Sequence, residues 1–290
     1  MPPRVHVTAP VPPRIEAALA AEFELGPAPD GADGIVATPA DRVDSAFLDR
    51  VGPQLRVVAM YAVGTDNVDL EAARARGIVV TNTPGVLTRA TAELTIALLL
   101  ALARRIVEGD RLIRRGEPWR WTPAFMLGSG LHGKTIAVVG FGRIGREVAR
   151  LAEALGMRVL HSRPLADLLD EADVVSLHVP LTGTTRHLID ANALRRMKPS
   201  AVLVNTSRGA VVDDAALVVA LETGEIAGAA LDVYEHEPDV HPGLVRRENV
   251  VLAPHLGSAT AETRDAMGML VLEGLRAVLL EGRVPENAVA

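Results

Sequence analysis

The chain has 290 residues, with 30 Lys and Arg, 36 Asp and Glu, and no cysteine. Its formal net charge of −6 argues against a nucleic-acid-binding surface, which requires a basic domain. The lack of cysteine excludes disulfides, thiolate metal ligands, iron–sulfur clusters and thiol catalysis. Hydrophobic residues make up 49% of the chain, which is an ordinary globular composition, and the length suits two domains.

The longest apolar stretch, Leu94–Ala103, is about half of the ~20 residues that a membrane-spanning helix needs. The N-terminal residues lack the apolar region of a signal peptide and lead directly into a strand-like segment. We therefore expect a cytoplasmic protein that is not associated with a membrane.

Short β-branched runs alternate with helical stretches in the first part of the chain. Strands are expected at Arg4–Thr8, Gly34–Ala37, Leu55–Met60 and Ile78–Thr81, and a first helix at Arg14–Glu22. This alternation indicates a parallel sheet covered by helices. One long helix, rich in Ala and Leu, is expected over about Thr91–Arg115.

The alternation restarts after Gly116–Gly133, a segment rich in glycine that also holds both tryptophans. Further strands are expected at Thr135–Val139, Met157–His161, Val174–Val179, Ala201–Asn205, Ala227–Val233 and Val250–Ala253, and a closing helix at Ala261–Glu281. The continuous apolar runs are typical of parallel strands that are buried on both faces. The sequence therefore predicts an α/β protein with two doubly wound parallel sheets.

A glycine-rich turn, Gly140-Phe141-Gly142-Arg143-Ile144-Gly145, directly follows the strand Thr135–Val139 and precedes a helix. In this strand–turn–helix context the pattern predicts a dinucleotide-binding site. The first glycine permits the tight turn, the second lets the backbone approach a diphosphate, and the third lets helix and strand pack closely. The free N–H groups at the start of the helix then bind the diphosphate.

The end of the next strand lacks the acidic residue that binds the ribose 2′-hydroxyl of NAD. That place reads His161-Ser162-Arg163-Pro164, where Arg163 offers a cationic fork and Ser162 a hydroxyl for a 2′-phosphate. This favours NADP(H), with NAD(H) possible if Arg163 is only an exposed arginine. The connection to the following strand is short for a parallel crossover, so the adenosine side is expected to be more open than usual.

Three further segments follow predicted strands: Asn205–Gly209, Asp232–Pro238 and Pro254–Ser258. Ligands of open α/β sheets bind outside the carboxyl ends of the strands, so these segments should meet the glycine turn at one edge. Together they supply an arginine, carboxylates and a histidine, a set suited to the reduction of a keto acid.

The chain resembles the D-isomer-specific 2-hydroxyacid dehydrogenase family almost from end to end. Besides the glycine turn and the three strand-end segments, the likeness lies in Val57-Val58, Gly64–Asp69 and Thr81–Gly85. Within the family it is most similar to glyoxylate/hydroxypyruvate reductases, on the segment Trp119–Pro123 and the pair Ser162-Arg163.

The resemblance implies roles for individual residues. His255 would donate a proton to the keto oxygen, with Glu237 behind it favouring the imidazolium. Glu235 is a competing carboxylate, but the family pattern places the partner immediately before Pro238. Arg208 would bind the substrate carboxylate and polarise the keto group. Backbone N–H groups of Ala62, Val63 and Gly64 would hold the other end of that carboxylate.

The resemblance also implies the domains and the remaining contacts. A flavodoxin-like substrate-binding domain would comprise residues 1–90 and 264–290, and a Rossmann cofactor-binding domain residues 91–263. Asp232 would hold the nicotinamide carboxamide. The other expected cofactor contacts, besides the glycine turn, Ser162 and Arg163, are His178, Val179, Pro180, Thr206, Ser207 and Gly257. No metal is expected.

Two alternatives to a reductase of glyoxylate, hydroxypyruvate or a related small 2-keto acid remain open. One is an NAD-dependent enzyme like D-3-phosphoglycerate dehydrogenase, and the other is a dinucleotide-sensing scaffold like the corepressors that resemble this fold. A homodimer is the expected assembly. Trp121 would either reach the partner's active site or pack in a dimer arm.

Overall fold

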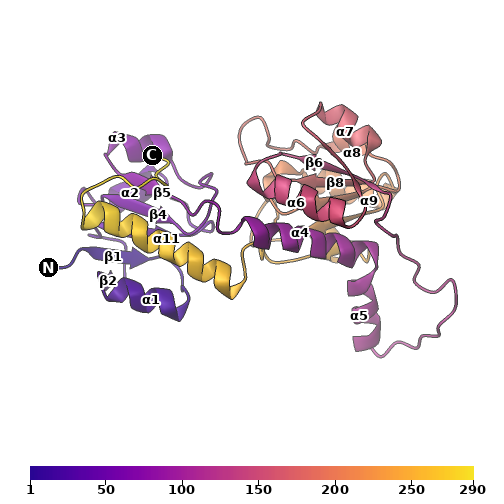
Figure 1. The fold of residues 1–290 in the computed structure, drawn as a ribbon, viewed down its shortest axis with the longest axis horizontal. Helices are drawn as coiled ribbons and strands as arrows, with labels where there is room; N and C mark the ends of the chain where they lie inside the picture. The colour runs from indigo at the N-terminus through magenta and orange to yellow at the C-terminus, as the bar shows by residue number, and fades with distance from the viewer. The chain divides into compact units, whose positions relative to one another are not determined.

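The computed structural model describes all residues, 1–290, and divides the chain into two compact units. Unit 1 combines Met1–Leu87 with Ser258–Ala290, and unit 2 comprises Thr88–Gly257. Unit 2 is thus inserted into unit 1 along the sequence (Figure 1).

Unit 1 holds a five-stranded parallel sheet in the order β2-β1-β3-β4-β5. The strands are β1 (Arg4–Val7), β2 (Glu24–Gly26), β3 (Gly34–Ala37), β4 (Val57–Met60) and β5 (Val79–Thr81). The helices are α1 (Pro13–Ala20), α2 (Ser45–Val51), α3 (Leu70–Ala75) and α11 (Ala261–Leu279). This strand order is that of flavodoxin-like folds.

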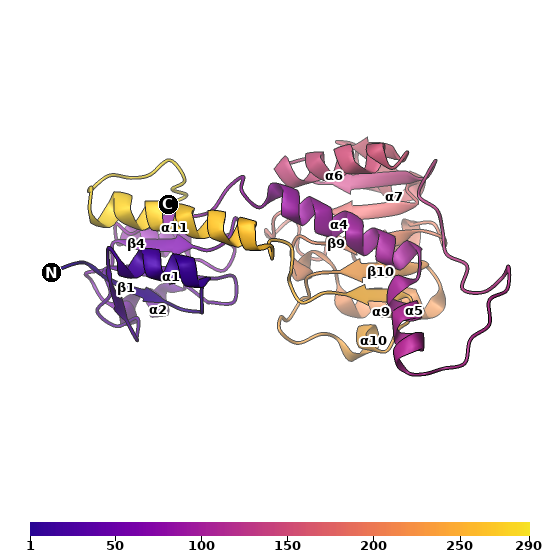
Figure 2. The same cartoon turned by 60° about the horizontal axis from the view of Figure 1, so that its bottom comes forward.

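Both faces of this sheet are covered by helices. Leu48 of α2 and Ala73 of α3 pack with Ile35, Val58 and other strand residues in one buried cluster. On the opposite face, α11, the last helix of the chain, packs on β4 beside α1 (Figures 1 and 2). The continuous burial of β3 and β4 follows from this double covering.

Unit 2 holds a six-stranded sheet in the order β11-β10-β9-β8-β6-β7, with every pair parallel. The strands are β6 (Thr135–Val139), β7 (Arg158–His161), β8 (Val174–Leu177), β9 (Val202–Asn205), β10 (Gly228–Leu231) and β11 (Val250–Leu252). The helices are α4 (Thr88–Ala103), α5 (Ile106–Arg114), α6 (Arg143–Ala154), α7 (Leu165–Glu171), α8 (Ala191–Arg196), α9 (Asp214–Thr223) and α10 (Pro242–Val245), with a 3₁₀ turn, η1, at Gly209–Val211.

In the classic Rossmann order 3-2-1-4-5-6, β6 and β7 correspond to the first and second strands. The third strand, which normally lies at the edge beyond the second, is missing here. The connection from β7 to β8 contains only α7, so no residues remain to form that outer strand. As a result β7 is an edge strand, and its residues are exposed or half-buried while β6 is buried throughout.

Alternate residues of β6 point to the two helical layers. Ile136 and Val138 pack against the layer of α4 and α6, whereas Ala137 and Val139 pack against the layer of α7, α8 and α9. Figure 2 shows α4 and α6 side by side over one face of the sheet. These layers confirm the predicted class, an α/β fold with two doubly wound parallel sheets.

The prediction of a single helix over Thr91–Arg115 was wrong, because the structure has two helices there, α4 and α5. The chain turns at Arg105, whose φ of 54° lies in the left-handed region, and α5 begins at Ile106. The Arg105 guanidinium binds the carboxylate of Glu108 in the first turn of α5 at 2.6 and 2.7 Å. This pairing fixes the bend that the Ala- and Leu-rich pattern does not reveal.

Candidate active site

The glycine turn is closely packed at two of its three glycines. Gly140 has a φ of 96°, and a Cβ at this position would lie 2.6 Å from the carbonyl of His178. A Cβ at Gly145 would lie 2.1 Å from the carbonyl oxygen of Gly140. At Gly142, in contrast, a Cβ would meet nothing within 4 Å. Packing therefore requires glycine at positions 140 and 145. Gly142 instead leaves the backbone at the start of α6 open, as a bound diphosphate requires.

The end of β7 lies beside this turn. Val138 pairs with His161 across the sheet, and the rings of Phe141 and His161 stack with centroids 3.6 Å apart. Ser162 has a left-handed φ of 52° and its Oγ lies 3.0 Å from Nδ1 of His161. Arg163 follows, with its guanidinium 2.7 Å from Oε1 of Glu171 on α7.

His178 lies directly behind Gly140, at the end of β8. Its backbone N–H donates to Val139 at 2.7 Å, and its Nε2 lies 2.8 Å from the hydroxyl of the fully buried Ser176. Burial lowers the pKa of His178 to about 4, so the ring is neutral at physiological pH. The neutral ring cannot balance the charge of a phosphate. Pro180, two residues on, accepts a hydrogen bond from Thr185 at 2.6 Å, which fixes the loop after Val179.

His255 and Glu237 form the central pair of the site. Nδ1 of His255 and Oε2 of Glu237 are 2.7 Å apart, and each side chain is 34% exposed. The other carboxylate oxygen accepts the N–H of Tyr234 at 3.0 Å. Burial raises the pKa of Glu237, but the hydrogen bond and charge of His255, the Tyr234 N–H and the charge of Arg208 together hold it below its ordinary value.

Arg208 belongs to the loop that follows β9. The side chain of Asn205 organises this loop, because its oxygen accepts from Ser207 at 2.8 and 3.0 Å and its amide donates to the Arg208 carbonyl at 2.9 Å. A Cβ at Gly209 would lie only 1.8 Å from the carbonyl carbon of Tyr234. The loop of Arg208 is therefore pressed against the loop that carries Glu237.

Asp232 braces the loop of His255. It is fully buried, and its two oxygens accept the N–H groups of Leu256 and Gly257 at 2.6 and 2.8 Å. Its carbonyl also accepts the N–H of His255 at 2.9 Å. Desolvation raises the pKa of Asp232, against the opposing effect of these donors and of His255. This backbone contact was not evident from the sequence, which suggested only a contact with nicotinamide.

Glu235, the competing carboxylate, faces away from His255. It lies 2.6 Å from Nε2 of His187 and 3.6 Å from Arg186, and its N–H donates to Asp214 at 3.2 Å. The structure therefore brings His255 to Glu237 and not to Glu235. His187 and Asp214 were missed from the sequence, since nothing in their local patterns marks a contact with a residue so far along the chain.

The remaining predicted residues occupy the same edge of unit 2 or a loop of unit 1. The hydroxyl of Thr206 lies 2.8 Å from that of Thr95 on α4, in a buried contact. In unit 1, the loop Ala62–Gly64 follows β4, and the side chain of Asn82 donates to the Val63 carbonyl at 2.8 Å. The N–H of Thr83 donates to the Ala62 carbonyl at 2.9 Å. These two hydrogen bonds hold the loop through its carbonyl groups.

Comparisons with known proteins decide the family. Residues 96–257 match the model described as "D-isomer specific 2-hydroxyacid dehydrogenase, NAD binding domain". A glyoxylate reductase from Thermococcus litoralis is 50% identical over 278 residues, which cover 89% of this chain and 83% of that protein. The chain belongs to the D-isomer specific 2-hydroxyacid dehydrogenase family. The resemblance inferred from the sequence motifs is thus confirmed.

Solved structures of similar proteins agree with this membership. The TT0316 protein from Thermus thermophilus is 46% identical, with a TM-score of 0.91 over 99% of this chain and 100% of that one. An NADPH-dependent glyoxylate/hydroxypyruvate reductase from Sinorhizobium meliloti, in complex with NADP and malonate, is 35% identical with a TM-score of 0.89. It is matched over 97% of its length and 100% of this chain.

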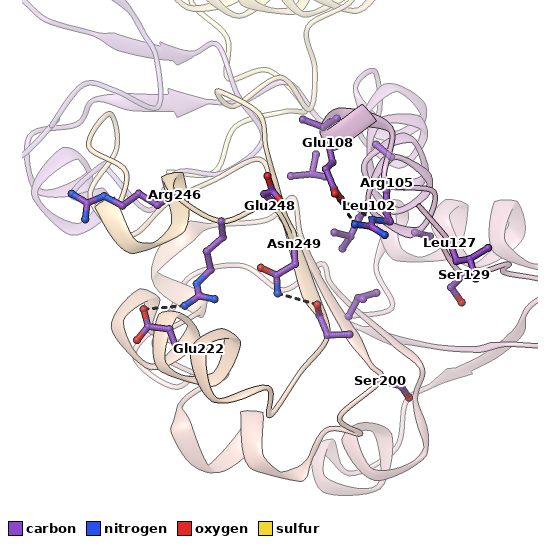
Figure 3. A pocket seen from close by; sticks show the side chains of 18 of the residues that line it. Leu102, Arg105, Glu108, Leu127, Ser129, Ser200, Glu222, Arg246, Glu248 and Asn249 are labelled. Carbon is purple, nitrogen blue, oxygen red and sulfur yellow. Dashed lines mark hydrogen bonds and ion pairs between the residues drawn. The ribbon is translucent and has the colours of Figure 1, made fainter. Parts of the chain in front are cut away.

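A cavity of about 910 Å³ lies elsewhere in this dehydrogenase. Its lining includes Val202, Ala227 and Asn249, at the amino-terminal ends of β9, β10 and β11 (Figure 3). None of the predicted site residues lines it. Within it, Arg105 pairs with Glu108, and Asn249 donates to the Ala227 carbonyl (Figure 3). Because dinucleotides bind at the carboxyl ends of the strands, this cavity is not the cofactor site of the family.

Two broader features complete the description. No group of three or more His, Asp or Glu side chains is arranged to hold a metal ion. None of the helices combines the length and the apolar composition needed to cross a lipid bilayer.

Proposed function

We propose that this chain reduces a small 2-keto acid of the glyoxylate or hydroxypyruvate type to the D-2-hydroxy acid, using NADPH in preference to NADH. The observation that supports this most directly is the 2.7 Å contact between His255 and Glu237, beside the loop of Arg208. The names of the relatives, glyoxylate reductase and NADPH-dependent glyoxylate/hydroxypyruvate reductase, support the same substrate class.

The cofactor would be held by this chain at the glycine turn. The open backbone at Gly142 and the start of α6 suit the diphosphate, and Ser162 and Arg163 suit a 2′-phosphate. The expected contacts of the nicotinamide half are His178 to Pro180, Thr206, Ser207, Asp232 and Gly257. When bound, the reduced nicotinamide supplies the hydride, and the protein supplies orientation and charge.

His255 is the proposed proton donor. Since Nδ1 is engaged by Glu237, Nε2 is the nitrogen that remains for the keto oxygen of the substrate. The ionised Glu237 carboxylate favours the imidazolium from which the proton comes. The proton leaves Nε2 as the negative charge develops on the keto oxygen, so the product is an alcohol and a neutral imidazole.

Arg208 is the proposed anchor of the substrate carboxylate. Its planar fork suits a carboxylate, and its positive charge also stabilises the charge that develops on the keto oxygen. The N–H groups of Ala62, Val63 and Gly64 are also proposed to bind the substrate, so unit 1 is the proposed substrate-binding unit. A homodimer is proposed from the exposed Trp119 and Trp121 on the segment that follows α5.

A kinetic panel tests the assignment. NADPH and NADH oxidation is followed with glyoxylate, hydroxypyruvate and pyruvate, and NAD⁺ reduction with 3-phosphoglycerate. We expect turnover of the keto acids, and His255→Gln should lower kcat by about 10²-fold or more because the general acid is lost. The control His236→Gln changes an exposed histidine beside Glu237 and should retain wild-type turnover.

Three results would contradict the proposal. Dinucleotide binding without turnover of any keto acid would favour a sensing scaffold, and efficient turnover of 3-phosphoglycerate alone would favour the dehydrogenase alternative. Full activity of His255→Gln would remove this residue from the mechanism.

A further inference from the structure

Four charged side chains of β7, of the turn after it and of α7 form a cluster of ion pairs. Nη2 of Arg163 is 2.7 Å from Glu171 and 3.9 Å from Asp167. Glu171 also lies 3.5 Å from Nη2 of Arg158 on β7. Two positive and two negative charges therefore offset one another, and all four side chains are between 39% and 60% exposed.

This cluster exists because the crossover is short. α7 begins only two residues after Arg163. The side chain of its last residue, Glu171, contacts the Arg163 guanidinium. A longer connection with an outer strand would separate the two side chains. The contact is therefore a consequence of the same contraction that leaves β7 at the edge of the sheet.

One member of the cluster, Arg163, follows the strand whose end lies beside the glycine turn. The stack of Phe141 on His161 joins the turn to the end of β7, and Arg163 is two residues beyond His161. The end of this strand is where a Rossmann domain meets the adenosine ribose. Arg163 is thus placed for a 2′-phosphate, but its guanidinium is already bound to a carboxylate.

The carboxylate of Glu171 is ionised at neutral pH. The hydrogen bond from Arg163 is the largest effect on Glu171, and it lowers the pKa of the carboxyl together with the charges of Arg163 and Arg158. A 2′-phosphate must therefore displace an anion from Arg163. Since the pair is exposed, water and salt screen it and the displacement is not costly. A phosphate carries more charge than a carboxylate, so it can compete for the fork.

We propose that Glu171 weakens the preference of this enzyme for NADPH by competing with the 2′-phosphate for Arg163. With NADH, the Arg163–Glu171 pair stays closed and no cation is left unpaired beside the ribose. With NADPH, the pair opens and Arg163 turns to the phosphate. The inference rests on the proposed function, because it assumes that the glycine turn binds a nicotinamide dinucleotide.

Two nucleotides without nicotinamide test this directly. The affinities of adenosine 2′,5′-bisphosphate and adenosine 5′-monophosphate are measured by calorimetry for the wild type and for Glu171→Gln. We expect Glu171→Gln to bind the bisphosphate about two- to fivefold more tightly relative to the monophosphate, because the competing charge is gone. The same variant should raise the kcat/KM ratio of NADPH to NADH by a similar factor.

A matched control removes the same charge from the neighbouring position. Asp170 lies on α7 but pairs with Arg196 at 2.5 Å and not with Arg163. Asp170→Asn therefore reports the general effect of one negative charge fewer on the helix, and its affinity ratio should stay near the wild-type value. An equal rise in Asp170→Asn and Glu171→Gln would overturn the proposal.

A double-mutant cycle shows whether Glu171 acts through Arg163. Arg163→Gln should lose the preference for the bisphosphate, and adding Glu171→Gln to it should then leave the ratio unchanged. A ratio that is unaltered or falls in the single variant Glu171→Gln would overturn the inference alone, provided that keto acids are still reduced. If wild-type protein binds neither nucleotide and oxidises no reduced nicotinamide, the proposed function itself is wrong.

Discussion

At the scale of single residues, three carboxylates near β10 have three different partners. Glu237 binds the ring of His255, Asp232 binds two backbone N–H groups of the following loop, and Glu235 binds His187. Of the three, only Glu237 is hydrogen-bonded to the imidazole of His255, the proposed proton donor. The other two hold the loops on which the pair depends.

The first prediction concerns the charge of Glu237. Its pKa is held below the ordinary value, so the carboxylate is ionised across the neutral range and favours the protonated imidazole. Glu237→Gln keeps a hydrogen-bond acceptor but removes this charge. We expect kcat at pH 7 to fall by about tenfold or more, because the imidazole loses its ionised partner.

The measurement is kcat for glyoxylate from about pH 5 to pH 10, at saturating NADPH. Glu235→Gln serves as the matched variant, because it removes a charge two residues away that is bound to His187. A profile for Glu237→Gln that coincides with the wild-type profile would show that this carboxylate does not support the proton donor.

The sequence placed Arg208, Glu237 and His255 after strands of one sheet, as the structure does, but, apart from the Glu237–His255 pair that the family resemblance implied, it did not predict which residues contact one another. Strand ends bring Arg208, Glu237 and His255 to one edge, and this follows from buried apolar runs alone. The partner of Glu235, in contrast, is His187, which precedes it by 48 positions and joins it only through the packed fold. The Arg163–Glu171 contact likewise depends on the exact path of α7, which no local pattern specifies.

At the scale of secondary-structure elements, the 3₁₀ turn η1 joins two loops of the site. Gly209 begins this turn, and its Cα faces the backbone of Tyr234 with no room for a side chain. The positions of Arg208 and of the Glu237 loop are therefore coupled through one backbone contact.

Gly209→Ala tests this coupling. Its Cβ would lie 1.9 Å from the Tyr234 oxygen, so the two loops must separate. We expect kcat to fall by about 10²-fold, since small displacements of reacting groups are costly, while nucleotide affinity remains close to wild type. Gly183→Ala is the control, because a Cβ there meets nothing within 4 Å. Steady-state kinetics with nucleotide binding by calorimetry distinguishes loop displacement from general misfolding.

The elements themselves could be predicted where burial imposes a simple pattern. Strand β6 matches the continuous apolar run Thr135–Val139 residue for residue, because both of its faces are covered. The bend between α4 and α5 could not be predicted, since an arginine in the left-handed region carries no sequence signal comparable to glycine.

At the scale of the whole molecule, the buried Asp214 is predicted to lower thermal stability at neutral pH. Burial raises its pKa above the ordinary 3.8, and the nearby Glu235 carboxylate adds to this, while the Glu235 N–H opposes it. Below pH 3.8 the group is protonated whether folded or unfolded and has no charge to bury. As the pH rises through the folded pKa, the unfolded state ionises more readily, so the folded state loses stability.

Asp214→Asn keeps an oxygen for the Glu235 N–H and removes the titration. We expect its melting temperature to exceed that of the wild type by about 2 °C at pH 7, and the difference to shrink as the pH approaches 4. Differential scanning calorimetry across this range measures both values. A constant difference at all pH values would show that packing rather than charge causes the effect.

The insertion of one unit into the other also sets an order of events on the ribosome. Every residue of unit 2 has been synthesised once Gly257 is added, whereas unit 1 still lacks α11. Until that helix emerges, one side of β4 has no cover, because α11 supplies the packing there. The middle of the polypeptide can therefore reach its native state while the first part waits for the last, which reverses the usual amino-to-carboxyl succession of nascent domains.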